Sequence, residues 1–264
     1  MKNIIDAEVS PVAAAVQALT VDEESAGQRL DNFLIRHLKG VPKTHVYRII
    51  RTGEVRINKG RASADTRIQT GDVVRVPPVR VATPSPDAPV VPGREFPLLM
   101  EDEHMLAINK PAGVAVHGGS GVSFGVIEAL RAARPDEAEK LELVHRLDRD
   151  TSGVLIIARK PSVLRMLHAG LREGEGFEKR YLALVKGSWQ LGKKRIEAPL
   201  RTDLRVGGER TVKVAAGGKA ATSDFRPVQG FGKLASLLEV SILTGRTHQI
   251  RVHAAYAGHP VAGD

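Results

Sequence analysis

Between residues 21 and 76 the hydrophobic positions first follow a helical period and then alternate. Apolar residues recur at intervals of three and four in the first half of this segment, which predicts two amphipathic helices. Their apolar positions are Leu30, Phe33, Leu34, Leu38, Val46, Ile49 and Ile50. Thr44 is the predicted N-cap of the second helix, and Gly53 ends it. Short strands are predicted at 55–57 and 73–76, so this segment is expected to be a small α+β module.

From residue 98 onward, short apolar runs bounded by turns outnumber the helical patterns. The strand candidates are 106–108, 114–116, 143–144, 154–157, 181–185 and 237–242. Helical patterns cover 126–133 and 162–171. A doubly wound fold would alternate strands with helices, so this order instead favours an α+β domain with a mixed or antiparallel sheet.

Proline separates these two regions. Seven of the fifteen prolines lie between residues 77 and 97. Because proline fixes φ and lacks an N–H donor, this stretch is expected to be a semi-rigid, extended linker. Residues 1–20 show no strong pattern and are expected to form a flexible arm. The predicted organisation is an arm at 1–20, a small module at 21–76, a linker at 77–97 and a larger α+β domain at 98–264.

The composition excludes several classes of protein. The 264 residues include no cysteine, which excludes a disulfide framework and thiolate metal sites. No apolar run approaches the roughly 18–20 residues that span a bilayer. The mildly apolar stretch 12–19 lacks a basic leader and contains Gln17, so a signal peptide is not expected. We therefore expect a soluble protein of the cytoplasm.

The positive charge is concentrated in the small module. Residues 35–80 carry eleven Lys or Arg and three acids, an excess of eight in a chain whose net charge is +9. Charge this localised is typical of a surface that binds a polyanion. The alternative is a solvated basic face without a partner.

Three polar segments of the larger domain could carry chemistry. His145-Arg146-Leu147-Asp148-Arg149-Asp150-Thr151-Ser152-Gly153 forms a polar loop between two apolar strands. Lys179-Arg180-Tyr181-Leu182-Ala183 places a tyrosine at a strand start, and Gly245-Arg246-Thr247-His248-Gln249-Ile250-Arg251-Val252-His253 follows a strand. Taken singly, each has an ordinary structural interpretation: a charged turn, a core or edge aromatic, and a helix start with scattered basic residues.

Together and in this order, the three segments resemble motifs of the RluA-type pseudouridine synthases. Asn109-Lys110-Pro111-Ala112-Gly113 and Val116-His117 also match that family. The preceding module is similar to the S4 RNA-binding fold, which the larger members of the family carry. Its expected RNA-binding residues are Lys43, Arg48, Arg51, Arg56 and Lys59. The resemblance covers residues 21–264.

The resemblance implies an isomerase that converts uridine to pseudouridine in RNA, with large-subunit ribosomal RNA as the expected partner. It makes Asp148 the essential carboxylate, either as a nucleophile or as a base. The other implied site residues are Arg251 as the cation that holds Asp148 ionised, Ile250 against the pocket, Tyr181 stacked on the flipped uracil and Arg146 in the space the base leaves. Asp150 varies in the family pattern and is assigned to the loop. No cofactor and no membrane partner are implied, and a monomer is expected.

Two other functions are compatible with parts of the sequence. A serine hydrolase would use Ser123, Asp148 and His248, with His117-Gly118-Gly119 as an oxyanion segment, but residues 118–121 stand where a strand should precede the serine. A non-catalytic RNA-binding protein would use the S4 module alone. No metal site is predicted, because there is no H-E-x-x-H motif and His248 and His253 are off a shared helical face.

The sequence ends at Gly258-His259-Pro260-Val261-Ala262-Gly263-Asp264. Members of the family continue with further strands and a helix. From this resemblance we expect a catalytic domain that is incomplete at its C-terminus, with low stability and poor activity.

Overall fold

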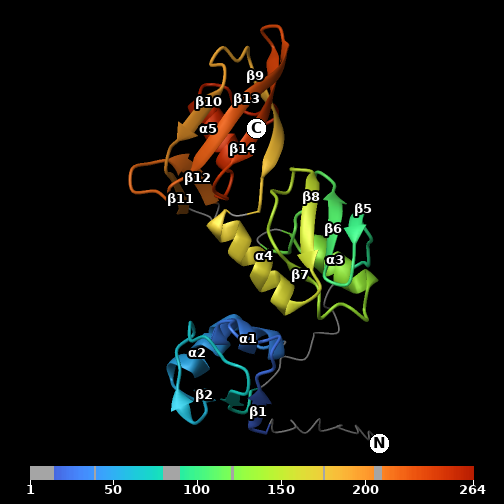
Figure 1. The fold of residues 1–264 in the computed structure, drawn as a ribbon, viewed down its shortest axis with the longest axis vertical. Helices are drawn as coiled ribbons and strands as arrows, with labels where there is room; N and C mark the ends of the chain where they lie inside the picture. The colour runs from blue at the N-terminus through green and yellow to red at the C-terminus, as the bar shows by residue number, and fades with distance from the viewer. Residues whose placement is uncertain (1–14, 39, 80–89, 120–121, 175, 205–209) are drawn as a thin grey trace, which may run out of the picture. The chain divides into compact units, whose positions relative to one another are not determined.

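The computed structural model describes residues 15–38, 40–79, 90–119, 122–174, 176–204 and 210–264. The chain forms two compact units (Figure 1). The first contains Met1–Lys110, His117–His145 and Gly153–Arg165, and the second contains Pro111–Val116, Arg146–Ser152 and Met166–Asp264. In the described ranges no helix combines the length and the apolar character needed to cross a membrane.

The N-terminal part of the first unit is the predicted α+β module. Its elements are β1 (Gln17–Thr20), α1 (Leu30–His37), α2 (Lys43–Arg51), β2 (Arg56–Ile57), β3 (Gly60–Arg61) and β4 (Val73–Val76). The strands form an antiparallel sheet of order β1-β4-β2-β3. The predicted apolar positions of both helices are buried in one core with strand residues such as Val74 and Val76. The two predicted helices are therefore confirmed.

Two details of this module differ from the prediction. Gln17–Thr20 is not part of a flexible arm, because it pairs with β4 as strand β1; the rest of the predicted arm, 1–14, lies outside the described residues. Thr44 is not the N-cap of α2, since the helix begins one residue earlier and Pro42 holds the capping position. Proline suits this helix start because its ring fixes φ close to the value that a helical residue adopts.

The predicted linker is only partly described. Residues 80–89 lie outside the described ranges. On either side of them the backbone has no regular structure, and an apolar side chain is buried on each side: Val79 in the core of the N-terminal module and Phe96 beneath the guanidinium of Arg94. The described ends of this stretch are extended, as the prolines predict.

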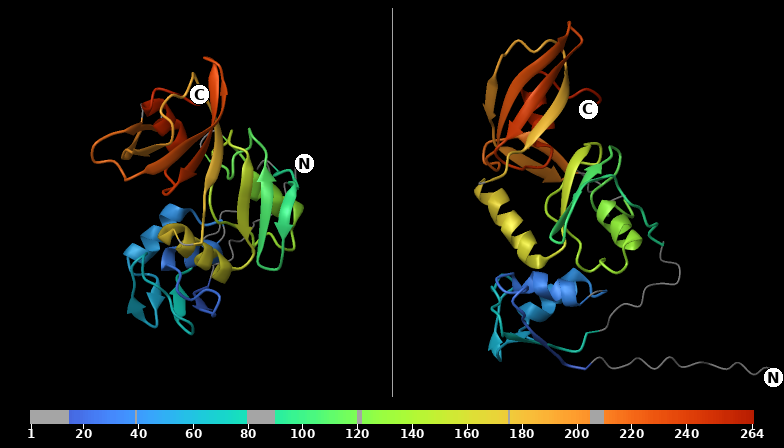
Figure 2. Two further views of the ribbon diagram at one scale, coloured as in Figure 1. Left: turned by 45° about the horizontal axis from the view of Figure 1, so that its top comes forward. Right: turned by 45° about the vertical axis from the view of Figure 1, so that its right-hand side comes forward.

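A second sheet completes the first unit. It has the order β5-β6-β8-β7 and is antiparallel throughout. Its strands are β5 (Leu98–Glu101), β6 (Met105–Lys110), β7 (Glu142–Leu143) and β8 (Gly153–Ala158). Helix α3 (Val126–Ala133) lies along one face (Figure 2). The strand predicted at 114–116 is wrong, because this stretch follows a turn at Ala112 and Gly113 and pairs with no strand.

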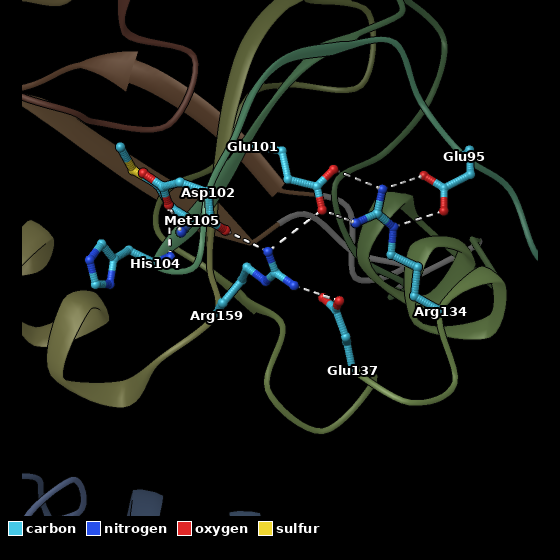
Figure 3. Close-up of polar contacts among 8 residues, drawn as sticks. All are labelled: Glu95, Glu101, Asp102, His104, Met105, Arg134, Glu137 and Arg159. Carbon is cyan, nitrogen blue, oxygen red and sulfur yellow. Dashed lines mark hydrogen bonds and ion pairs between the residues drawn. The ribbon is translucent and has the colours of Figure 1, made fainter.

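Ion pairs of partly exposed side chains hold the connections of this sheet together. Arg134, at the end of α3, donates from Nε to Glu95 Oε1 at 2.8 Å and from Nη1 to Glu101 Oε1 at 2.7 Å (Figure 3). Arg159, just after β8, lies between Glu137 and Glu101. The two acids that face Arg134 raise the pKa of its guanidinium well above the ordinary value. These contacts fix the end of α3 to the segment that leads into β5.

The second unit is built on an antiparallel sheet of order β10-β13-β14-β9. The elements from residue 161 onward are α4 (Pro161–Glu173), β9 (Arg180–Lys186), β10 (Lys194–Glu197), β11 (Leu200–Leu204), β12 (Arg210–Val214), β13 (Thr222–Phe231), β14 (Ala235–Ile242) and α5 (Gln249–Tyr256). Alternate residues of β9 and β14 are buried, and they form a core with Trp189 stacked on Phe225. The predicted strands at 181–185 and 237–242 are confirmed.

Candidate active site

The polar loop predicted to carry chemistry is anchored at both of its ends. His145, just after β7, accepts a hydrogen bond from the Ile156 N–H of β8 at 3.1 Å. Leu147 is buried, and the Thr151 N–H donates to the Asp148 carbonyl at 3.1 Å to form a turn. The loop residues Arg146–Ser152 belong to the second unit. Asp148 therefore lies on a short loop that hydrogen bonds and a buried leucine hold in place.

The two acids of this loop lie in different environments. The Asp150 carboxylate is 72% exposed and pairs with its neighbour Arg149 at 3.2 Å. The Asp148 side chain is 26% exposed and lies 4.0 Å, Oδ2 to Nε2, from His248. A partly enclosed carboxylate among other polar groups suits chemistry better than a solvated one. The difference supports the choice of Asp148 over Asp150.

A buried glutamine organises the turn before α5. Gln249 is 3% exposed, and its Oε1 accepts from Thr244 Oγ1 at 2.7 Å and from the Arg246 N–H at 3.0 Å. Its Nε2 donates to the Thr222 carbonyl and to Ser223 Oγ, each at 2.9 Å. Both ends of the side-chain amide are thus satisfied, so the start of α5 is pinned to β13.

The hydrogen bonds of the glutamine continue to the last residue of the third motif. His253 is fully buried; its Nδ1 lies 3.0 Å from Ser223 Oγ and its Nε2 lies 3.0 Å from the Ala198 carbonyl. Since a carbonyl only accepts, Nε2 carries the proton and Nδ1 accepts from the serine hydroxyl. Burial lowers the pKa of His253. Gln249 and His253 therefore support the fold rather than reach toward a substrate.

Tyr181 of the second segment and Arg251 of the third lie close enough to Asp148 to interact with its charge. Tyr181, at the start of β9, has its pKa raised by burial and then by the negative charge of Asp148. Arg251 interacts electrostatically with Asp148 and Asp150, which contributes to the rise of its own pKa. Ile250 packs against the core of the second unit. The structure thus brings Asp148, Tyr181 and Arg251 together from three separate segments.

The direct partner of Arg251 is a residue that the sequence analysis did not consider. Arg251 donates through Nε to Asp264 Oδ2 at 2.8 Å and through Nη2 to Asp264 Oδ1. This pair is the main reason that the pKa of Arg251 is raised and that of Asp264 lowered. Asp264 is carried there by residues 260–262, which hydrogen-bond along β9. Arg251 was expected to contact Asp148. In the structure it interacts with Asp148 through its charge, and its hydrogen-bonded ion pair is with Asp264.

A cavity of about 680 Å³ opens beside these groups. Its lining includes Thr211, Lys213, His248, Arg251, Tyr256 and Asp264. Lys213 comes from β12 and pairs with Asp203 at 2.7 Å. His248 and Arg251 come from the start of α5, and Asp264 follows that helix. The cavity joins cationic groups to exposed aromatic surface at Tyr256, a combination suited to a nucleotide.

The other expected RNA contacts are exposed. Arg146 projects from the loop and is open to solvent. In the N-terminal module, Lys43, Arg48 and Arg51 are exposed on α2, Arg56 lies half-buried on β2, and Lys59 lies at the tip of the β2–β3 hairpin. Asn58 and Lys59 both have positive φ, as a two-residue hairpin turn requires. These residues form one basic face on elements that a common core holds together.

The sequence analysis missed His248, Asp264 and Gln249 as parts of this site. Gln249 and His248 stand inside a recognised motif, but periodicity does not distinguish a buried amide from an exposed one. Asp264 lies far from the motif in sequence, so no local signal pairs it with Arg251. The serine hydrolase alternative gains nothing from the structure, because Ser123 follows an isolated bridge between Gly119 and Val122 rather than a strand.

Comparisons with known proteins agree on one family. Residues 104–256 match the family described as RNA pseudouridylate synthase, and residues 28–74 match the S4 domain. The chain is 55% identical to the ribosomal large subunit pseudouridine synthase C of Yersinia pestis over 254 residues, which is 94% of this chain and 78% of the relative. It is 54% identical to the protein of that name from Escherichia coli strain K12, with the same coverage.

A solved structure is similar as well. The human protein RNA Pseudouridylate Synthase Domain Containing 1 aligns with a TM-score of 0.54 and 26% sequence identity. The alignment covers 66% of this chain and 71% of that one.

Proposed function

Because the chain belongs to the RNA pseudouridylate synthase family and carries an S4 domain, we propose that it isomerises specific uridines of large-subunit ribosomal RNA to pseudouridine. The relatives that bear the name ribosomal large subunit pseudouridine synthase C support this substrate. The proposal rests on one observation. Asp148, Tyr181 and Arg251 come from three separate segments and lie together near the turn that precedes α5. A protein that only bound RNA would not need this set.

Asp148 is the reactive group in this proposal. Pseudouridine formation breaks the N1–C1′ bond, turns the uracil and joins C5 to C1′, while the C5 hydrogen leaves and N1 gains a proton. A carboxylate can promote this as a nucleophile or as a base. Arg251, whose positive charge interacts with Asp148, is proposed to orient this carboxylate.

The uridine reaches this carboxylate by leaving its stack. A base within a helix cannot be turned over, so it must be extruded at a cost of a few kcal/mol. Tyr181 is proposed to stack on the extruded uracil, with Ile250 packed behind the site. Arg146, which is exposed on the same loop as Asp148, is proposed to fill the gap left in the RNA.

The S4 domain is proposed to supply affinity and register. Its basic face carries Lys43, Arg48, Arg51, Arg56 and Lys59, which suit contacts to phosphates. Phosphate contacts do not select a base, so the choice of uridine is assigned to the catalytic domain. We further propose that the protein acts as a monomer in the cytoplasm, where ribosomal RNA is available.

The proposal is tested by mapping pseudouridine in total RNA from cells with and without the gene. Carbodiimide adducts stop reverse transcriptase at pseudouridine, and we expect a defined set of stops in large-subunit RNA to vanish with the gene. Restoring the gene with Asp150→Asn should return the stops, whereas Asp148→Asn should not. Unchanged stops in the deletion strain would contradict the proposed substrate.

A further inference from the structure

The basic groups around Asp148 differ in how they act on it. Arg251 interacts with Asp148 and Asp150 through its charge, while its Nε–Nη2 edge is hydrogen-bonded to Asp264. Lys213 lines the same cavity but pairs with Asp203. Among the residues that the structure describes, the basic side chain paired with Asp148 is His248, at 4.0 Å from Nε2 to Oδ2.

His248 faces both acids. It pairs with Asp148 on the loop Arg146–Ser152, and its charge also acts on Asp264, whose pKa it helps to lower. The other charged or titratable groups around it are Arg251 on its own helix and Lys213 across the cavity on β12.

The backbone of His248 is held in a costly conformation. Its φ of 53° and ψ of 25° lie in the left-handed region, directly before α5. A non-glycine residue there costs on the order of 1–2 kcal/mol, and asparagine or glycine would fit more easily. The four hydrogen bonds of Gln249 fix the turn in this shape. Strain of this kind persists where the surrounding structure imposes it, and it is concentrated at functional sites.

We propose that His248 is a positioning residue: its imidazole Nε2 faces Oδ2 of Asp148 and holds this carboxylate in orientation. This inference rests on the proposed function, because it concerns the same carboxylate. It assigns the strained turn a purpose: the left-handed backbone directs the imidazole toward the loop, while the helix that follows carries Arg251. The pairing of Asp264 with Arg251 then leaves His248 as the close partner of Asp148.

The consequence is a dependence of catalysis on the side chain of one histidine. Without the imidazole the orientation of the Asp148 carboxylate loosens, so the rate of the chemical step should fall. Substrate affinity should change little, because His248 acts on the carboxylate and not on the RNA backbone.

The test compares His248→Asn with wild type in the full chain, using kcat and KM for pseudouridine formation in large-subunit ribosomal RNA. Asparagine tolerates the left-handed backbone but lacks the imidazole. We expect kcat to fall about tenfold and KM to stay within about twofold. His248→Gly, which also relaxes the backbone, should show the same loss of kcat.

His104→Asn is the matched control, since His104 is a half-exposed histidine on the β5–β6 turn. It should leave kcat and KM unchanged. A wild-type kcat in His248→Asn would overturn the inference, and so would a loss of kcat/KM that came from a higher KM alone. If wild type itself produced no pseudouridine in this RNA, the proposed function would fail instead. The urea transitions of both variants, followed by Trp189 fluorescence, should match wild type.

Discussion

Replacing Gln249 with leucine should destabilise the second unit by about 2–4 kcal/mol. The side chain is 3% exposed and makes four hydrogen bonds. Leucine of similar size fills the space but leaves the Thr244 hydroxyl and the Arg246 N–H without the amide oxygen that accepts from them. Each buried polar group left unsatisfied costs about 1–3 kcal/mol. Two such groups would together cost about 2–6 kcal/mol. The lower half of this range applies because Arg246 is exposed and water can reach its N–H.

Urea denaturation followed by tryptophan fluorescence measures this loss in the right place. The chain has a single tryptophan, Trp189, and it is buried in the core of the second unit. Gln249→Leu should lower the midpoint of this transition while its slope stays the same. The control is Gln229→Leu, the same change at an exposed position of β13, which should shift the free energy of unfolding by less than about 0.5 kcal/mol. A loss below about 0.5 kcal/mol for Gln249→Leu as well would refute the assignment of Gln249 as the support of the α5 turn.

Three further predictions concern stability and RNA binding. The pKa of His253 is lower in the folded chain than in the unfolded chain, so unfolding takes up a proton at low pH. The free energy of unfolding should therefore fall as pH drops below about 6.5, and His253→Gln should flatten this dependence in the same fluorescence assay. Arg134→Met should lower the protection of α3 amides from hydrogen exchange by about 1–3 kcal/mol, because it leaves Glu95 and Glu101 facing each other, whereas Arg195→Met in an exposed pair should have little effect. Lys43→Gln and Arg51→Gln should each weaken RNA binding uniformly across sequences and reduce the slope of log affinity against log salt by about 0.7–0.9, and an unchanged slope would remove these residues from the phosphate contacts.

The elements that the sequence predicted well are those with a regular period and a buried face. Both helices of the S4 domain follow from apolar residues at three- and four-residue intervals, and α3 begins and ends where the pattern does at 126–133. The strands β8 and β14 likewise follow from uninterrupted apolar runs. In these cases local pattern and tertiary burial require the same conformation.

The elements that escaped prediction depend on pairing or on polar contacts. Strand β1 is a short run that becomes a strand because β4 lies beside it. Residues 114–116 are apolar but follow a tight turn and find no partner strand. Helix α5 has little amphipathic pattern, and a buried glutamine and histidine hold its inner side. Neither pairing nor a buried polar network leaves a periodic signal.

The residues of the candidate site also divide into those that the sequence predicted and those that it did not. Asp148, Tyr181 and Arg251 could be named because they stand in motifs of a recognisable family. The Asp264 partner of Arg251 and the approach of His248 to Asp148 depend on how distant segments meet in space. Residue types and spacing cannot supply that geometry.

The central claim is that Asp148 carries the isomerisation of uridine. Joining C5 to C1′ expels the C5 hydrogen, so the most direct measurement is tritium release from large-subunit ribosomal RNA labelled at uridine C5, with wild type, Asp148→Asn and Asp150→Asn. We predict release by wild type and by Asp150→Asn that equals the pseudouridine formed, and no release above background by Asp148→Asn. Release by Asp148→Asn at the wild-type rate would contradict the account.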